Sequence, residues 1–263
     1  MKPLVSIEDK VVILTGGLGL LGRPFSRALV DAGAKVAILD LSPSAIDLPR
    51  DRAFVIETDV TKRASLEAAL ETVQSTFGAP HALINNAAID SPPSAPMEEN
   101  GPFESYPEAS FDRVMNVNVK GVLLACQVFG GAMARTGRGS IVNIGSIYGM
   151  VSPDQRLYQY RRERGESYFK PVAYSVSKSA LLNLTRYLAT YFAPQKVRVN
   201  TLTLAGVENG QDPAFLAAYE QKVPLGRMAQ AADYTGALGF LISDASGYMT
   251  GSNMVVDGGF TAW

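Results

Sequence analysis

Short runs of apolar residues rich in valine and isoleucine recur along the chain, with room for a helix between most of them. The runs are Val11–Leu14, Val36–Leu39, Phe54–Ile56, Ala82–Ile84, Ser140–Ile144, Val197–Leu204 and Met254–Val256. Strands that read as continuous apolar runs, without alternation, are buried on both faces, as in a parallel sheet covered by helices on each side. The sequence therefore predicts an α/β protein built on a doubly wound parallel sheet.

The segments between these runs predict helices and two unusual loops. Apolar residues return every three or four positions in Phe111–Arg135 and in Tyr174–Phe192, which is typical of helices that cover a sheet. Two other segments follow predicted strands: Asp90–Pro107 is rich in proline, and Ser152–Lys170 is dense in arginine and tyrosine. Open α/β sheets bind ligands at this edge. A length of 263 residues fits one such domain, over residues 1–263.

Composition excludes several classes of function. A formal net charge of −1, without a block of like charges, argues against a nucleic-acid partner. Cys126 is the only cysteine and His81 the only histidine, so we expect no disulfide, no Cys/His metal site and no histidine-based triad. The sequence shows neither a secretory signal pattern nor a run of about 18 apolar residues. These features predict a cytoplasmic protein with no membrane partner.

A glycine-rich turn follows the first predicted strand. It reads Thr-Gly-Gly-Leu-Gly-Leu-Leu-Gly from Thr15 to Gly22, and glycines let a backbone approach the pyrophosphate of a dinucleotide at a helix N-terminus. Asp40 ends the second strand, 24 residues after Gly16, where a carboxylate can accept hydrogen bonds from both ribose hydroxyls. Because no basic residue stands in the turn to neutralise a 2′-phosphate, the sequence predicts NAD in preference to NADP. The alternative for Asp40 is a solvated carboxylate at a strand end.

Tyr174 and Lys178 lie four residues apart at the start of a predicted helix, and so share one face. A tyrosine that acts as a base near neutral pH needs its pKa lowered by about three units, or roughly 4 kcal/mol. One unit charge at about 4 Å and an effective dielectric near 20 supplies roughly that amount. We therefore expect Lys178, helped by an oxidised nicotinamide, to lower the pKa of Tyr174. By itself the pair also fits an ordinary amphipathic helix start.

These features, in order along nearly the whole chain, resemble the short-chain dehydrogenase/reductase family. The matching segments are Thr15-Gly16 to Gly22, Asp59-Val60, Asn85-Asn86-Ala87-Ala88, Asn116-Val117-Asn118, Ser146, and Tyr174 with Lys178. The resemblance implies a Rossmann fold of about seven strands and an enzyme that interconverts a secondary alcohol and a ketone. It also implies a homotetramer or homodimer, commonly a tetramer built on the helices within Phe111–Arg135 and Tyr174–Phe192.

The resemblance also assigns roles to residues. Ser146 would hold and polarise the substrate oxygen, and Tyr174 would exchange the proton. Lys178 would bind the nicotinamide ribose, and Asn118 would anchor a water chain for proton relay. The implied cofactor contacts are Gly16, Leu20, Leu21, Gly22, Asp40, Leu41, Asp59, Val60, Asn86, Ala87, Ala88, Tyr174, Lys178, Ala205, Gly206 and Val207, and the implied substrate contacts are Ser146, Tyr148 and Tyr174.

The chain departs from the family pattern at three positions. Leu20 stands where a glycine is usual in the turn, Ala88 replaces the last glycine of Asn-Asn-Ala-Gly, and Ala205 replaces a proline after the sixth strand. Glycines at neighbouring positions keep the turn flexible. We therefore expect a reshaped turn that still binds the cofactor, with altered contacts to the pyrophosphate and the nicotinamide amide.

The segment between Ser146 and Tyr174 is longer than in many members of the family and predicts an insertion over residues 152–172. Its arginines and tyrosines could form a lid that holds an anionic or polyhydroxylated substrate, because arginine binds carboxylate and phosphate through two parallel hydrogen bonds. The candidate contacts are Arg156, Arg161 and Arg162. A solvated charged segment or a subunit contact would have the same composition. The C-terminal third resembles bacterial members assigned to sugar metabolism, which favours a sugar or a sugar derivative.

Two other functions remain open at this stage. A non-catalytic NAD(H)-binding regulatory module would keep the fold without turnover, although loss of Tyr174, Lys178 or Ser146 would be its usual signature. A sugar dehydratase or epimerase would use NAD transiently and release no reduced cofactor, but such enzymes usually carry a larger C-terminal substrate domain. Fold alone does not separate these functions.

Overall fold

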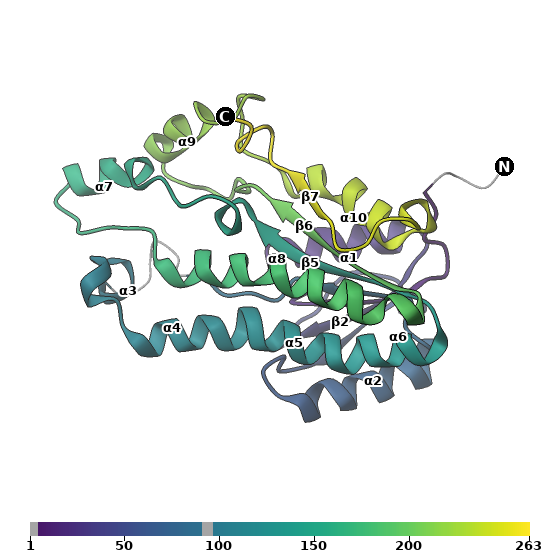
Figure 1. Ribbon diagram of the computed structural model, residues 1–263. Helices are drawn as coiled ribbons and strands as arrows, with labels where there is room; N and C mark the ends of the chain where they lie inside the picture. The colour runs from purple at the N-terminus through teal and green to yellow at the C-terminus, as the bar shows by residue number, and fades with distance from the viewer. Residues whose placement is uncertain (1–4, 91–96) are drawn as a thin grey trace.

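The computed structural model describes residues 5–90 and 97–263, and its centre is one parallel sheet (Figure 1). The sheet has seven strands in the order β3-β2-β1-β4-β5-β6-β7. They are β1 (Val11–Thr15), β2 (Lys35–Asp40), β3 (Ala53–Glu57), β4 (Ala82–Asn85), β5 (Gly139–Ser146), β6 (Val197–Leu204) and β7 (Asn253–Val256). All neighbouring strands pair in parallel. Each apolar run predicted as a strand is one, and the doubly wound α/β fold is confirmed.

Helices cover both faces of the sheet. On one face, α2 (Arg63–Phe77), the long helix 108–136 and α8 (Val172–Phe192) pack in one buried cluster with the sheet. On the other face, α1 (Gly22–Asp31) and α10 (Thr235–Ile242) form a second buried cluster. Burial of apolar area at about 25 cal/mol per Å² drives this arrangement. β1 and β4 are neighbours in the sheet, and the strand order reverses between them. The helix that follows β1 and the helix that follows β4 lie on opposite faces. Open sheets bind ligands at such a switch point.

The long helix differs from the prediction in its internal geometry. It consists of α4 (Glu108–Met115), α5 (Val122–Ala125) and α6 (Gly131–Thr136), joined by π-helical turns over Asn116–Gly121 and Cys126–Gly130. Such turns occur often at functional sites, and the first contains Asn118. By length and composition this helix could cross a membrane, but more than half of its apolar window is buried inside the protein, as expected of a core helix.

The predicted insertion folds into short helices above the carboxyl ends of the strands. A 3₁₀ turn, Gln155–Tyr158, packs against α9 (Pro213–Glu220) and leads into α7 (Gln159–Glu163). In Figure 1, α7 and α9 lie at the same end of the molecule, beyond the tips of β5 and β6. A third buried cluster joins the insertion to α9 through Tyr158, Tyr168, Tyr219 and their apolar neighbours. Of the proline-rich loop, residues 91–96 lie outside the described part, and α3 spans Met97–Asn100.

Candidate active site

A cavity of about 1300 Å³ lies along the carboxyl edge of the sheet. Residues after β1, β2 and β3 line one half of it, and we call this the cofactor half. The insertion and the segment after β6 line the other, which we call the substrate half. Ser146, Tyr174 and Lys178 lie where the two halves meet. The loop after β4 borders both.

The glycine turn of the cofactor half has the shape that a dinucleotide requires. Gly16 has a φ of +62°, and a Cβ there would lie 2.8 Å from the Cα of Ala87. Only glycine tolerates both conditions without strain. The side-chain amide of Asn86 donates to the Gly16 carbonyl at 2.9 Å, which ties the loop after β4 to the turn. Glycine at position 16 therefore lets the loop after β4 approach the turn closely.

Asp40 lies in the cavity wall as predicted. One carboxylate oxygen accepts a hydrogen bond from the Leu18 amide at 2.9 Å, and this bond joins the end of β2 to the turn. Asp59, at the end of β3, accepts from the amide and hydroxyl of Thr61 and faces Lys62 at 3.1 Å. The Thr61 hydroxyl is the main reason why the pKa of Asp59 lies below its ordinary value. Asp40 and Asp59 thus both line the cofactor half, and each is held by its own hydrogen bonds.

The structure brings the predicted cofactor contacts together with one exception. Those that line the cavity are Gly16, Leu20, Leu21, Asp40, Leu41, Asp59, Val60, Asn86, Ala87, Ala88, Tyr174, Lys178, Ala205, Gly206 and Val207. Gly22 does not line it but begins α1, where a Cβ would come within 2.1 Å of the Gly16 carbonyl oxygen. Its role is to let the helix approach the turn. Leu20, which stands in the place of a glycine, is 54% exposed and so fits without distorting the turn.

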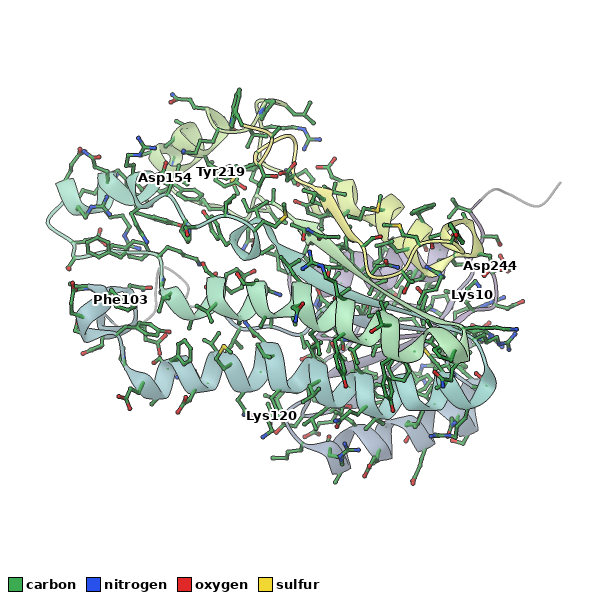
Figure 2. All side chains as sticks on the ribbon, viewed as in Figure 1. Lys10, Phe103, Lys120, Asp154, Tyr219 and Asp244 are labelled. Carbon is green, nitrogen blue, oxygen red and sulfur yellow. The ribbon has the colours of Figure 1, made fainter. Side chains whose placement is uncertain are left out.

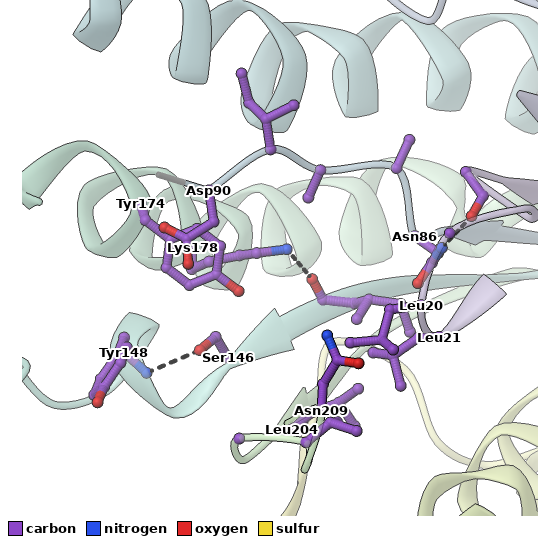
Figure 3. Close-up of a pocket in the computed structure, with 18 of the residues that line it drawn as sticks. Leu20, Leu21, Asn86, Asp90, Ser146, Tyr148, Tyr174, Lys178, Leu204 and Asn209 are labelled. Carbon is purple, nitrogen blue, oxygen red and sulfur yellow. Dashed lines mark hydrogen bonds between the residues drawn. The ribbon is translucent and has the colours of Figure 1, made fainter. Parts of the chain in front are cut away.

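Tyr174 and Lys178 extend from the first turns of α8 toward the end of β5 (Figure 3). The Lys178 ammonium donates to the Ile144 carbonyl at 2.8 Å and lies 5.6 Å from the centre of the Tyr174 ring. Burial is the main cause of a Lys178 pKa lowered to about 8. The Ser146 hydroxyl accepts a hydrogen bond from the Tyr148 amide at 3.2 Å, which leaves its own hydrogen to donate elsewhere.

The sequence led us to expect a lowered pKa for Tyr174, but the protein's own groups raise it. Burial raises the pKa of Tyr174, the Asp90 carboxylate adds to the rise, and hydrogen bonding with Ser146 only partly opposes it. The predicted lowering by Lys178 did not include the desolvation of the phenol. It also depended on the positive charge of an oxidised nicotinamide, which is not part of the chain.

Asn118 holds the loop after β4 and does not face the cavity directly. Its side-chain amide accepts from the Ile89 amide at 2.8 Å and donates to the Ile89 carbonyl at 2.9 Å. It also donates to the Ser177 hydroxyl at 3.0 Å, one residue before Lys178. The residue itself is almost completely buried. Asn118 therefore fixes the loop that carries Asp90 relative to the helix that carries Tyr174.

The three predicted arginine contacts separate in the structure. Arg161 lines the cavity, and its guanidinium lies 4.1 Å from the centre of the Tyr168 ring and pairs with Glu166. Arg162 instead donates to the backbone carbonyls of Tyr168 and Gln155 and so shapes the insertion from within.

Arg156 points away from the cavity and pairs with Asp154 at 2.9 Å, with 81% of its side chain exposed. Figure 2 places Asp154 at the α9 end of the molecule, next to Tyr219. Neither Arg156 nor Arg162 is among the residues that line the cavity. Composition could not distinguish them from Arg161, because all three lie within one short basic stretch. Tyr148, in contrast, lines the cavity as expected.

Asp90, Asp212 and Tyr219 line the substrate half but were not singled out individually from the sequence. Asp90 lines the cavity and pairs with Lys170, and Asp212 lines it and pairs with Arg164 at 2.7 Å. Tyr168 and Tyr219 add aromatic walls. The partners in these two ion pairs lie 80 and 48 positions apart in the chain. Opposite charges at such separations carry no sequence signal, although the place of Asp90 directly after a strand does indicate the ligand edge.

A cradle shaped for a dinucleotide thus opens onto a buried serine, a buried lysine and a partly buried tyrosine, and this combination is typical of nicotinamide-dependent oxidoreductases. A family model described as enoyl-(acyl carrier protein) reductase matches residues 20–261. The chain belongs to the short-chain dehydrogenase/reductase family. It is an oxidoreductase of the kind that acts on hydroxyl groups, as its named relatives do.

Individual relatives match over almost the whole chain. An NAD-dependent glycerol dehydrogenase of Listeria innocua is 29% identical, over 97% of this chain and 95% of its own. A 2-(S)-hydroxypropyl-CoM dehydrogenase of Xanthobacter autotrophicus is 32% identical, over 97% and 98%. A solved short-chain dehydrogenase of Leptospira borgpetersenii with bound NAD+ is 33% identical, with a TM-score of 0.86 over 97% of this chain and 94% of that one.

Proposed function

We propose that the protein oxidises a secondary alcohol to a ketone, or catalyses the reverse reaction, with NAD as cofactor and Tyr174 as general acid/base. The observation that carries the proposal is the place of Tyr174, whose ring lies in the cavity wall where the cofactor and substrate halves meet. Oxidation of an alcohol requires that a proton leave oxygen while hydride leaves carbon. When bound, NAD+ supplies the hydride acceptor and a positive charge.

The side chains at this meeting point bind the substrate oxygen, transfer the proton and hold the site in place. Ser146 has its hydroxyl hydrogen available to donate to the substrate oxygen. Tyr174 accepts the proton in oxidation and returns it in reduction. Lys178 is the cation near the tyrosine ring, 5.6 Å from its centre. Asn118 acts through the backbone of Ile89 as a positioning residue, and it remains our candidate anchor for a proton-relaying water chain.

The preference for NAD over NADP rests on Asp40. Its carboxylate lies in the cavity wall and accepts from the Leu18 amide, so its position is fixed before any ligand binds. A carboxylate accepts hydrogen bonds from the two ribose hydroxyls of NAD but repels the 2′-phosphate of NADP. The NAD-dependent and NAD-bound relatives are consistent with this choice.

The substrate is a small hydroxylated molecule: a sugar, a sugar derivative or another polar or anionic compound. Tyrosine hydroxyls and charged groups line the substrate half, and the glycerol dehydrogenase among the relatives acts on such a compound. Carbohydrate metabolism in the cytoplasm is the setting that we propose. We also propose a homotetramer, because Leu123, Val176, Tyr187 and Tyr191 expose apolar surface on the two helices that the family commonly uses for assembly.

The reaction is tested by following the near-ultraviolet absorbance of reduced nicotinamide. Wild-type protein is offered sugars, sugar acids, sugar phosphates, polyols and simple secondary alcohols, with NAD and NADP in parallel. We expect reduction of NAD with at least one class of hydroxylated compound, and slower reduction of NADP. Conversion of a sugar without release of NADH would instead indicate a dehydratase or epimerase. NADH binding without turnover on any compound would favour a non-catalytic module.

A further inference from the structure

Three ion pairs line the substrate half of the cavity, and in each pair both members face it. They are Lys170 with Asp90, Arg161 with Glu166, and Arg164 with Asp212. Each of the three cations of the insertion that line the cavity is thus paired with a carboxylate in the same wall. An anionic substrate would have to displace one of these carboxylates from its partner. A neutral molecule with many hydroxyl groups can donate to the carboxylates and accept from the cations.

The pair formed by Asp90 and Lys170 lies closest to the reacting centre. The Lys170 ammonium is 5.2 Å from the centre of the Tyr174 ring, and its side chain is only 9% exposed. The Asp90 side chain is 38% exposed. Figure 3 shows Asp90 beside Tyr174, on the same side of the cavity. Both residues line the cavity, and Asp90 is the more exposed of the two.

The charge of Asp90 acts on much of the substrate half. It contributes to raising the pKa values of Tyr148, Tyr158 and Tyr168 as well as that of Tyr174. Its backbone is held in place because the preceding residue, Ile89, is bound on both its amide and its carbonyl by Asn118. A carboxylate in the cavity wall whose backbone is held in place can accept hydrogen bonds from neutral hydroxyl groups and disfavours a nearby anion.

We propose that Asp90 and Lys170 form a subsite for a second substrate hydroxyl, on the carbon next to the reacting one, and that the substrate is an uncharged polyhydroxylated compound. The hydroxyl donates its hydrogen to Asp90 and accepts one from the Lys170 ammonium. This inference rests on the proposed function, because it places the reacting carbon at Tyr174. It narrows the substrate from hydroxylated or anionic compounds to neutral polyols and sugars.

The test uses three four-carbon probes that differ in one group: butane-2,3-diol, butan-2-ol and 3-hydroxybutanoate. NAD reduction is measured with wild type, Asp90→Asn, Lys170→Met and Tyr174→Phe. In wild type we expect kcat/KM for the diol to exceed that for the other two by about 10- to 100-fold, the usual effect of a hydrogen bond to a charged group. Because Asp90 also acts on the pKa of Tyr174, the readout is the ratio of kcat/KM for the diol to that for butan-2-ol, in which a change at Tyr174 affects both alcohols alike. Asp90→Asn should remove most of this ratio, and Lys170→Met should reduce it in part.

A matched control is available in Lys10 and Asp244, a lysine–aspartate pair at the opposite end of the molecule from Asp154 and Tyr219 (Figure 2). Asp244→Asn should leave all three rates unchanged. Equal use of the three probes by wild type, with turnover lost in Tyr174→Phe, overturns the subsite and leaves the proposed function standing. Preference for 3-hydroxybutanoate overturns it in favour of an anion site. Absence of NAD reduction with every probe and every compound of the wider panel overturns both proposals.

Discussion

The two halves of the cavity are built by different means. In the cofactor half, backbone atoms and short polar contacts make the site: the turn around Gly16, the amide that binds Asp40, and the Asn86 amide on the Gly16 carbonyl. In the substrate half, long side chains from separate segments make the site, and their opposite charges form ion pairs in the cavity wall. A backbone site tolerates few substitutions. A side-chain site can change its specificity while the fold stays the same.

We expect the largest effect from Gly16→Ala, which changes the cofactor half. Alanine at this position would have to keep the positive φ of Gly16, and its Cβ would lie only 2.8 Å from the Cα of Ala87. Together these costs reach about 3 kcal/mol or more, and we expect NADH affinity, measured by fluorescence titration, to fall by at least about 100-fold. Gly137→Ala is the control, because Gly137 has a φ of +68° and no atom near its Cβ position. Equal NADH affinity in both variants would contradict the steric argument.

A second prediction concerns the point where the halves meet. The pKa of Lys178 is lowered by burial from 10.5 to about 8, so between these pH values the unfolded chain binds more protons than the folded protein. Stability from this group therefore rises as the pH increases through that interval, by about 3 kcal/mol. Denaturant unfolding of wild type and Lys178→Met should show the wild-type free energy of unfolding rising relative to the variant between about pH 8 and 10.5. Parallel pH profiles would show that the lysine is not desolvated.

A third change addresses cofactor choice. Asp40→Ala removes the carboxylate proposed to bind the ribose hydroxyls, and loss of hydrogen bonds to a charged acceptor costs about 1.5–3 kcal/mol. The ratio of kcat/KM for NAD to that for NADP should fall by about 10- to 100-fold. Glu57→Gln is the matched control, because Glu57 pairs in register with Asp40 but does not line the cavity. An unchanged ratio in Asp40→Ala would remove the basis for NAD preference.

The smallest effect is expected within the insertion, at Arg156. This side chain is exposed and pairs with Asp154 outside the cavity. Because exposed ion pairs contribute little to stability, Arg156→Ala should leave both the free energy of unfolding and KM essentially unchanged. Arg161→Ala should raise the substrate KM, because Arg161 lines the cavity against Tyr168. Steady-state kinetics of both variants make the comparison. A rise in KM for Arg156→Ala alone would reverse the assignment of the two arginines.

The difference between the cofactor half and the substrate half also explains which features the sequence could predict. The strands and the turn from Thr15 to Gly22 are local patterns, so their residues indicate both their structure and the edge of the sheet to which they belong. Tyr174 and Lys178 share a helix face for the same reason. The electrostatics of that face were not predictable: the hydrogen bond from Lys178 to Ile144 joins residues 34 positions apart. Pairing of Lys170 with Asp90 likewise depends on the packing of the insertion over the loop after β4.

The central claim is that Tyr174 moves the substrate proton at the meeting point of the two halves. It is tested most directly by single-turnover reduction of NAD+ with wild type and Tyr174→Phe, using a substrate found with the wild type and enzyme saturated with cofactor. General acid–base catalysis contributes about 10²- to 10⁴-fold, so the variant should bind NADH normally and produce reduced nicotinamide slower by at least about 100-fold. A variant that matches the wild-type rate would contradict the account.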